Sequence, residues 1–290
     1  MKGWVYRRYG SPDVLAFDEI DEPVPGADEI AIRVRASGLN AADWHIMRAD
    51  PFLVRFAVGL RKPRRHMIIG SDVAGVVERV GEKVTRFAPG DAVYVETMLK
   101  GGCAEIVVAR ANRAALMPFG LTFEQAAAVP MAGVTALTAI RHKGRLQPGQ
   151  SVLINGASGG VGTFAVQIAR ALGGRVTASC SAGAVDLVRS LGADEVLDYA
   201  VDDPIDSGRT YDLVVNIGGH ALPACAPADA EPPWDVGGGR RVAARGALRP
   251  GERGHEGGAD LAVRGAAAAS GREEAQRRRS RDPRDDDRGG

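Results

Sequence analysis

Cysteine, aromatic residues and an excess of charge of either sign are all scarce in this sequence. The three cysteines, Cys103, Cys180 and Cys225, are scattered, which excludes a disulfide framework or a CxxC metal knuckle and fits a reducing compartment. A formal net charge of +1 argues against general steering toward nucleic acid or membranes. No apolar run can span a bilayer and MKGWVYRRYG has no signal core, so we expect a cytoplasmic protein.

A second absence is confined to residues 221–290. This segment contains no Ile, Phe, Tyr, Met, Lys, Asn or Thr, and Ala, Gly and Arg supply more than half of it. So few large apolar side chains cannot offset the entropy lost on ordering the chain. We therefore predict a low-complexity, disordered tail over residues 221–290.

The segment from residue 1 to about 118 has the pattern of a β domain. Short apolar or alternating runs rich in Val and Ile are separated by Gly, Pro and Asp turns such as FAPGD. The runs are EIAIRVRASGLN, DVAGVVERVGEKV, DAVYVETM and CAEIVVAR. A later basic run, RFAVGLRKPRRH, is interpreted as a solvated loop, with a phosphate or nucleic-acid patch as the alternative.

The pattern changes between residues 119 and 220. Thr122 with Glu124 and Gln125 predicts a helix start, and Pro130 predicts a break in that helix. Strands and helices then alternate: SVLIN, RVTASCS, EVLDY and YDLVVNIG are predicted strands, and GGVGTFAVQIARALG and AVDLVRSLGA are predicted helices. Near-continuous apolar strands with amphipathic crossovers indicate a parallel sheet covered on both faces, the beginning of a doubly wound dinucleotide fold.

A glycine-rich loop lies between the first of these strands and its helix. In the GxGxxG pattern, Ala157 takes the first position, Gly159 the second and Gly162 the third. A small residue permits the tight turn, Gly159 lets the backbone approach a pyrophosphate, and Gly162 lets helix and strand pack closely. The phosphates would meet the positive end of the helix dipole. The predicted loop contacts are Gly156, Ala157, Ser158, Gly159, Gly160, Val161 and Gly162.

The end of the second strand of the parallel sheet distinguishes NAD from NADP. An NAD site places an Asp or Glu there to hold the ribose hydroxyls. This sequence has Ser179, Cys180 and Ser181 instead. No carboxylate would repel a 2′-phosphate and the hydroxyl of Ser181 could bind it, so we predict NADP(H). The alternative is that Ser181 only caps the next helix.

Together these segments resemble the medium-chain dehydrogenase/reductase family, and within it the zinc-free, zeta-crystallin-like quinone oxidoreductase branch. The resemblance covers residues 1 to about 220, in family order and spacing. It rests on ASGLNAADWH, GSDVAGVVERVGEKVTRFAPGDAV, AAAVPMAGVTAL, NGASGGVGTFAVQIAR and SLGADEVLDY. The family implies an α/β protein with a GroES-like β domain over residues 1–118, a Rossmann domain, here incomplete, over residues 119–220, and the active site in the cleft between them.

The resemblance also implies which residues carry chemistry. Zinc members of the family have Cys, His and Glu where this chain has Asn40, Ser71 and Asp72, and Asn and Ser are poor zinc ligands, so no metal is expected. Without a Lewis acid, hydrogen bonds must polarise the acceptor carbonyl. By family position, Asn40 and Asp43 face the nicotinamide cleft; both could instead only cap the following helix.

Four further side chains are assigned by family position or by chemistry. Thr135 lies beside the cofactor, and Tyr199 approaches its adenosine end or only packs on a strand. Trp44 could form an apolar wall for a flat acceptor. His45 has a near-neutral pKa when unperturbed and could donate a proton, or it is a surface residue. The expected partner is a small-molecule quinone, enone or aldehyde, and family members are often dimers through the edge of the Rossmann sheet.

Residues 222–241 can be read in a second frame. If each codon of LPACAPADAEPPWDVGGGRR is read one nucleotide later, permitted codons encode SLRALRRTLSPRGTLVVVGG, which has the pattern of an amphipathic helix, a turn and a buried strand. We interpret this as a frameshift near residues 219–221. The alternative is a native disordered tail, in which EEAQRRRSRDPRDDDRGG is a solvated charge run or a weak nucleic-acid contact.

The sequence therefore predicts a zinc-independent, NADPH-dependent oxidoreductase that the frameshift inactivates. Two alternatives remain open at this point: a protein that binds a dinucleotide without turnover, and a non-functional remnant.

Overall fold

The computed structural model describes residues 1–63, 66–202 and 209–217. The predicted frameshift and the predicted tail lie outside these residues. The chain divides into two compact units: the first comprises Met1–Thr138 and Thr163–Ile168, and the second comprises Ala139–Gly162 and the chain from Ala169 onward. The domain boundaries near residues 118 and 220 stay predictions.

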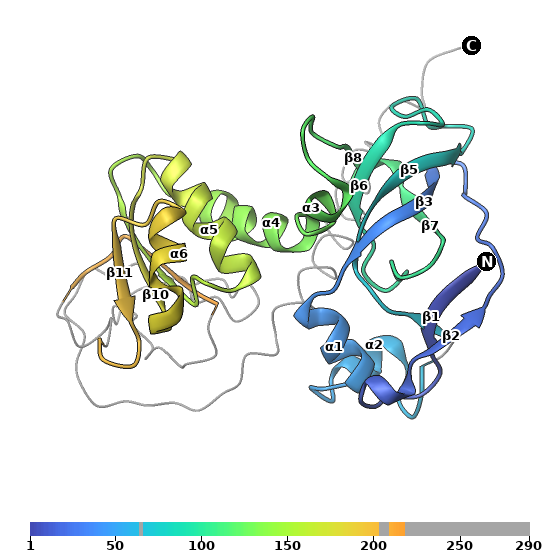
Figure 1. The fold of residues 1–290 in the computed structure, drawn as a ribbon, viewed down its shortest axis with the longest axis horizontal. Coiled ribbons are helices and arrows are strands. Elements are labelled where there is room, and N and C mark those ends of the chain that lie inside the picture. The colour runs from blue at the N-terminus through green and yellow to red at the C-terminus, as the bar shows by residue number, and fades with distance from the viewer. Residues whose placement is uncertain (64–65, 203–208, 218–290) are drawn as a thin grey trace, which may run out of the picture. The chain divides into compact units, whose positions relative to one another are not determined.

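The first unit is built on a five-stranded antiparallel sheet that curves around an apolar core (Figure 1). Its inward residues include Ile30, Ile32, Val73 and Val93, none of which is exposed to solvent. The alternating Val and Ile pattern is responsible, since successive strand residues face opposite sides of the sheet. In the order β7-β3-β5-β6-β8, the strands are β3 (Glu29–Gly38), β5 (Asp72–Val80), β6 (Ala92–Glu96), β7 (Ile106–Arg110) and β8 (Ala115–Leu116).

A smaller sheet and two short helices complete this part of the first unit. The sheet has the order β2-β1-β4 and consists of β1 (Lys2–Tyr6), β2 (Ala16–Glu19) and β4 (Met67–Ile68). The helices are α1 (Ala41–Arg48) and α2 (Val54–Val58). The solvated-loop interpretation of RFAVGLRKPRRH is wrong for its first residues, which lie in α2, because Val54 and Val58, one turn apart, are both buried.

Two helices follow where the sequence predicts one that is broken by proline. They are α3 (Phe123–Ala127) and α4 (Pro130–Leu137). The backbone N–H of Gln125 donates to Oγ1 of Thr122 at 3.3 Å, and the backbone N–H of Thr122 donates to Oε1 of Gln125 at 3.0 Å. This capping box confirms the predicted helix start. Pro130 is the first residue of α4. A backbone N–H at this position would have no intrahelical acceptor, so proline costs the helix no hydrogen bond there.

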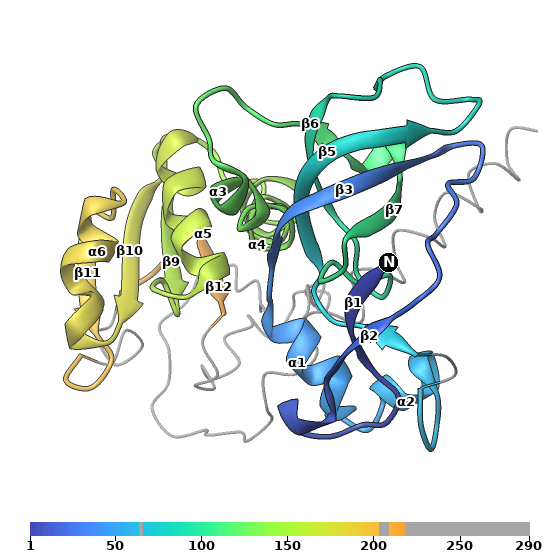
Figure 2. The same ribbon diagram turned by 45° about the vertical axis from the view of Figure 1, so that its right-hand side comes forward.

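The second unit contains a four-stranded parallel sheet (Figure 2). Its order β11-β10-β9-β12 matches the first four positions, 3-2-1-4, of the doubly wound fold. The α/β class is therefore confirmed. The strands are β9 (Ser151–Asn155), β10 (Arg175–Cys180), β11 (Glu195–Asp198) and β12 (Leu213–Asn216). The crossover helices are α5 (Gly160–Ala171), of which Thr163–Ile168 is counted with the first unit, and α6 (Val185–Ser190).

The apolar strands are buried as their sequences predict. Val152, Leu153 and Ile154 of β9 are almost completely inaccessible, and α6 packs against β10 and β11. Among the described residues, none of the helices has both the length and the apolar character needed to cross a membrane.

Candidate functional site

The glycine-rich loop joins the carboxyl end of β9 to the start of α5. Gly156 adopts φ 82°, a left-handed conformation that favours glycine. The backbone N–H groups of Gly156 and Ala157 both donate to the carbonyl oxygen of Ser179, at 3.1 and 3.0 Å. The turn is thereby tied to the carboxyl end of β10, which is the edge where doubly wound sheets bind their ligands.

The two later glycines of the pattern meet different surroundings. A Cβ on Gly162 would lie 2.2 Å from the carbonyl oxygen of Gly156, so only glycine lets α5 approach the loop this closely. A Cβ on Gly159 would make only ordinary contact, at 3.5 Å from the same oxygen, and Gly159 is exposed. The open space beside Gly159 would let a pyrophosphate approach the backbone of the loop, so the geometry of the loop fits a dinucleotide.

Ser181 and Tyr199 lie at the same carboxyl edge. Ser181 precedes a short 3-10 turn (Ala182–Ala184), but its side chain makes no capping hydrogen bond. The alternative prediction, that the Ser181 side chain caps the following helix, is therefore wrong. The backbone N–H of Tyr199 donates to the carbonyl oxygen of Cys180 at 3.1 Å, and its side chain is 47% exposed.

A buried polar cluster occupies the first unit, where β3 ends and β5 begins. Asn40 connects two carboxyl groups: its backbone N–H donates to Oδ2 of Asp43 at 2.8 Å, and its side-chain Nδ2 donates to Oδ2 of Asp72 at 3.0 Å. The Ser71 hydroxyl donates to Oδ1 of Asp43 in a short hydrogen bond. Asp43 therefore does act as a capping residue at the start of α1, as one reading of the sequence predicts, and it also anchors Ser71.

Ser71 and Asp72 belong to this cluster although neither was predicted as a site residue, and Asp72 makes the longer-range contacts. It is 1% exposed, and its two carboxyl oxygens accept from the backbone N–H of Met131 at 3.0 and 3.1 Å. Asp72 therefore links the Asn40 amide to the first turn of α4. The available signal was a carboxylate at the first position of a buried strand, a place where an unpaired charge would be unfavourable.

The cluster perturbs both carboxyl groups. Burial raises the pKa of Asp72 to about 7; the hydrogen bonds from Asn40 and Met131 oppose that shift, and the charges of Glu96 and Asp43 add to it. Burial also raises the pKa of Asp43, against the hydrogen bonds from Ser71 and Asn40. For both groups desolvation outweighs the hydrogen bonds, so burial raises each pKa above its ordinary value.

We expect the Asp72→Asn variant to lose part of the pH dependence of stability. Because the folded pKa of Asp72 is raised, its favourable contribution is complete below pH about 4 and is lost as pH rises through about 7. Urea unfolding at several pH values should show the wild-type free energy of unfolding falling over this window by roughly 4 kcal/mol more than that of the variant. Asp21→Asn, which changes an exposed carboxylate of the same unit, is the control; equal slopes for wild type and Asp72→Asn would contradict the assignment.

The remaining site residues of the first unit lie apart from these hydrogen bonds. His45 is half-buried on α1, and its Nδ1 lies 2.8 Å from the carbonyl oxygen of Asp50. Because a carbonyl only accepts, Nδ1 carries the proton of neutral His45, and Nε2 is the nitrogen left to exchange one. Trp44 is 44% exposed and stacks edge-on against His45 at 4.5 Å. Thr135 is half-buried on α4.

The polar side chains of the cluster hydrogen-bond to one another. The amide of Asn40 is engaged by Asp72, and the hydroxyl of Ser71 is engaged by Asp43. Over residues 1–63, 66–202 and 209–217, no group of three or more His, Cys, Asp or Glu side chains is placed to hold a metal ion.

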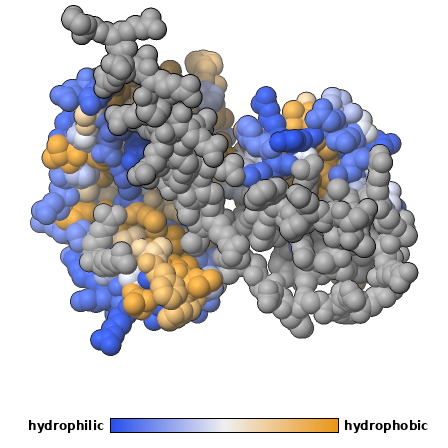
Figure 3. Space-filling view, turned by 180° about the vertical axis from the view of Figure 1, so that it is seen from behind, coloured by the Kyte–Doolittle hydropathy of each residue, from blue (hydrophilic) through white to orange (hydrophobic). Residues whose placement is uncertain are grey.

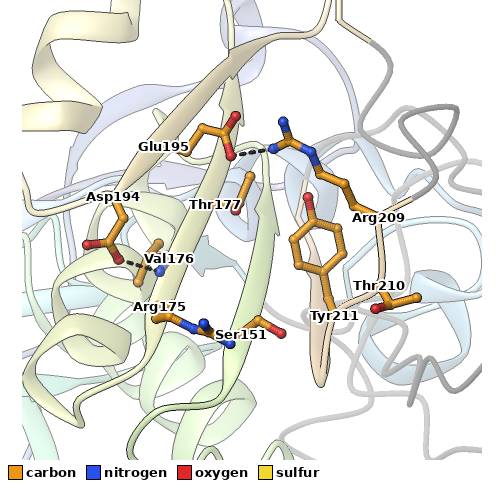
Figure 4. A pocket seen from close by; sticks show the side chains of 9 residues that line it. All are labelled: Ser151, Arg175, Val176, Thr177, Asp194, Glu195, Arg209, Thr210 and Tyr211. Carbon is orange, nitrogen blue, oxygen red and sulfur yellow. Dashed lines mark hydrogen bonds and ion pairs between the residues drawn. The ribbon is translucent and has the colours of Figure 1, made fainter.

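A pocket of about 700 Å³ opens at the other edge of the parallel sheet (Figure 4). Its walls include Ser151, Arg175 and Glu195, each the first residue of its strand, and Arg209 forms an ion pair with Glu195. Dinucleotides bind outside the carboxyl ends of such strands, whereas this pocket lies at their amino ends. The pocket is therefore separate from the glycine-rich loop.

Comparison with known proteins was made for both units. Residues 26–139 match the alcohol dehydrogenase GroES-like domain. The chain is 37% identical over 241 residues to the mitochondrial NAD(P)H oxidoreductase RTN4IP1 of Bos taurus, a match that covers 76% of this chain and 60% of that protein. It is also 37% identical to the chloroplastic quinone-oxidoreductase QR1 of Triphysaria versicolor, over 74% of this chain and 68% of that one.

Solved structures agree with these matches. The mycobacterial protein Rv1454c, solved in complex with NADPH, superposes with a TM-score of 0.60 at 32% identity, over 70% of this chain and 60% of that chain. The present chain spans about 60% of the length of the RTN4IP1 relatives that it matches.

Proposed function

The chain belongs to the medium-chain dehydrogenase/reductase family, in its quinone oxidoreductase-like branch, and from this premise we propose that its function is zinc-independent hydride transfer from NADPH to a quinone, enone or aldehyde. The single observation that supports it most strongly is the glycine-rich loop at the carboxyl edge of the parallel sheet, where Gly162 permits the close approach of α5. A bound NADPH would supply the hydride; the chain's own residues would bind, orient and protonate.

The polar cluster supports a role in orienting the acceptor. Without a metal, a carbonyl oxygen must be polarised by hydrogen-bond donors held in place beforehand. The Asn40 amide is such a donor, and the bond from its Nδ2 to Asp72 restricts its rotation. We propose that Asn40 polarises the acceptor oxygen, that Asp43 and Asp72 hold Asn40, and that protonated His45 delivers the second hydrogen from Nε2.

The preference for NADPH is supported by the end of β10. Ser179, Cys180 and Ser181 present no carboxylate there, and the Ser181 side chain makes no capping hydrogen bond. A carboxylate at this place would hold the ribose hydroxyls of NAD and repel a 2′-phosphate. Support also comes from the NADPH complex of the mycobacterial protein.

We expect fluorescence titration to show tighter binding of NADPH than of NADH. In the Ser181→Asp variant, repulsion between the new carboxylate and the 2′-phosphate should weaken NADPH binding by about tenfold while NADH binding is kept. Ser190→Asp, on the following helix, is the matched control for added charge. Equal affinities of the wild-type chain for the two cofactors, unchanged by Ser181→Asp, would overturn the assignment.

A second candidate function is dinucleotide binding without turnover. It is favoured by the position of β12, which pairs only with β9 among the described strands, whereas a doubly wound sheet continues beyond this position. Adding a quinone to the NADPH-loaded chain separates the candidates. Cofactor oxidation, by this chain or by a chain whose reading frame is restored at residues 219–221, supports the oxidoreductase. Binding without oxidation by both chains supports the second candidate, and absence of binding and oxidation indicates a non-functional remnant.

A further inference from the structure

Helix α2 and its flanks carry large apolar side chains on two opposite sides. Val54 and Val58 are buried in the first unit, with 1% and 7% exposure. The other large apolar residues of this segment face solvent with 56% to 60% exposure; they are Phe52, Leu53, Phe56 and Leu60, here called the α2 patch. An ordinary surface helix is polar on its outer side, so the outer side of α2 is unusual.

Side chains of the α2 patch pack against one another and against Arg55. The rings of Phe52 and Phe56 pack edge to face with centroids 5.9 Å apart. The Arg55 guanidinium lies 5.3 Å from the Phe52 ring and 5.2 Å from the Tyr9 ring, and its Nη1 donates to the carbonyl oxygen of Leu60 at 3.4 Å. Figure 3 shows apolar side chains gathering on one face of the first unit, in the region of α2.

Basic residues flank the α2 patch along the sequence. Arg48, Arg61 and Lys62 are exposed, and Asp50 is the only acidic residue between residues 45 and 66. The net charge of +1 is that of the whole chain, in which acidic residues elsewhere offset the positive charge of this segment. Exposed apolar side chains and exposed cations therefore lie in the same segment of the chain, residues 48–62.

We propose that the α2 patch docks the protein on an anionic lipid surface. Bilayers take up large apolar side chains at the boundary between headgroups and acyl chains, and their anionic headgroups attract neighbouring Arg and Lys. Nucleic acid would use the cations but would leave the α2 patch uncovered. A second copy of the chain in a two-fold dimer would bring like charges together across the interface. The lipid surface suits both features, whereas these two alternatives each suit one.

The test uses the full chain and sedimentation with two kinds of vesicle: phosphatidylcholine alone, and phosphatidylcholine mixed with phosphatidylglycerol. We expect binding to the anionic vesicles that weakens as salt is added. The double variant Phe52→Ser with Phe56→Ser should bind at least about tenfold more weakly, because both exposed rings lose their contact with the lipid. Circular dichroism and urea unfolding show whether it folds like the parent chain.

The matched control is Phe119→Ser, which removes a fully exposed aromatic ring far from α2 in the sequence and should leave vesicle binding unchanged. Arginines after residue 217 could bind anionic vesicles by themselves, and they are present in every variant. The contribution of the α2 patch is therefore the difference in binding between the double variant and Phe119→Ser. Equal vesicle binding by the parent chain and the double variant would overturn the proposal. So would a concentration-dependent dimer that the double variant abolishes, or binding to DNA but not to vesicles.

Discussion

Removing one nucleotide from the codons for residues 219–221 is expected to raise the rate of NADPH oxidation by a quinone by about two orders of magnitude or more. The shifted frame replaces residues 222–241 with SLRALRRTLSPRGTLVVVGG, whose apolar run GTLVVVGG has the composition of a buried parallel strand. In the described sheet, β12 pairs with β9 and is an edge strand. The restored segment would supply the next strand of the doubly wound order and cover that edge.

The same change is expected to raise the free energy of unfolding. We predict poor stability and weak or no turnover for the chain with its present reading frame, since an open sheet edge beside the cofactor site leaves the nicotinamide poorly held. The measurements are NADPH absorbance after quinone addition and urea unfolding. Removing two nucleotides at the same codons is the matched control, because it changes the same residues without restoring the family pattern.

A third gene variant shows which residues account for the change in stability. A gene that is shifted at residue 221 and shifted back after residue 241 changes only this window of twenty residues. Recovery of stability in that chain would assign the effect to the helix and strand encoded there. If the present chain is as stable as the frame-restored chain and oxidises NADPH as fast, the frameshift interpretation is wrong.

The second large effect is expected at Gly162, where the smallest possible side chain should be enough to disrupt the loop. In Gly162→Ala, the new Cβ would lie 2.2 Å from the carbonyl oxygen of Gly156 and 2.7 Å from Cα and the carbonyl carbon of Ala157. These are backbone atoms, so the start of α5 must move away from β9. We expect a loss of about 2–3 kcal/mol of stability and at least a tenfold loss of NADPH affinity.

Two other glycines separate the structural effect from the binding effect. Gly183→Ala adds a Cβ that meets nothing within 4 Å, so its free energy of unfolding should equal that of the parent chain. Gly159→Ala makes only ordinary contact and should also keep its stability, yet weaken NADPH binding, because the Cβ fills space that the pyrophosphate needs. If all three variants behave alike in urea unfolding and NADPH titration, the roles given to these glycines are mistaken.

Features that depend on neighbours in the sequence were predictable from the sequence. The capping box of α3 joins Thr122 and Gln125, three positions apart, and the pattern alone indicates it. The glycine-rich loop is likewise local, since its tight turn lies between a strand and a helix that the apolar pattern already marks. The segment around α2 was harder, because a basic run resembles a loop until the burial of Val54 and Val58 is known.

The sequence by itself determined the α/β class, the order of strands and helices in the parallel sheet, and the position of the glycine-rich loop, because periodicity and turn chemistry act over a few residues. Only the tertiary structure decided that Asp72 holds both Asn40, 32 positions away, and Met131, 59 positions away. The same is true of Ser179, whose carbonyl oxygen accepts from Gly156 and Ala157 across the sheet edge. Such contacts depend on which strands become neighbours, and burial then raises the pKa of the carboxyl groups that they enclose.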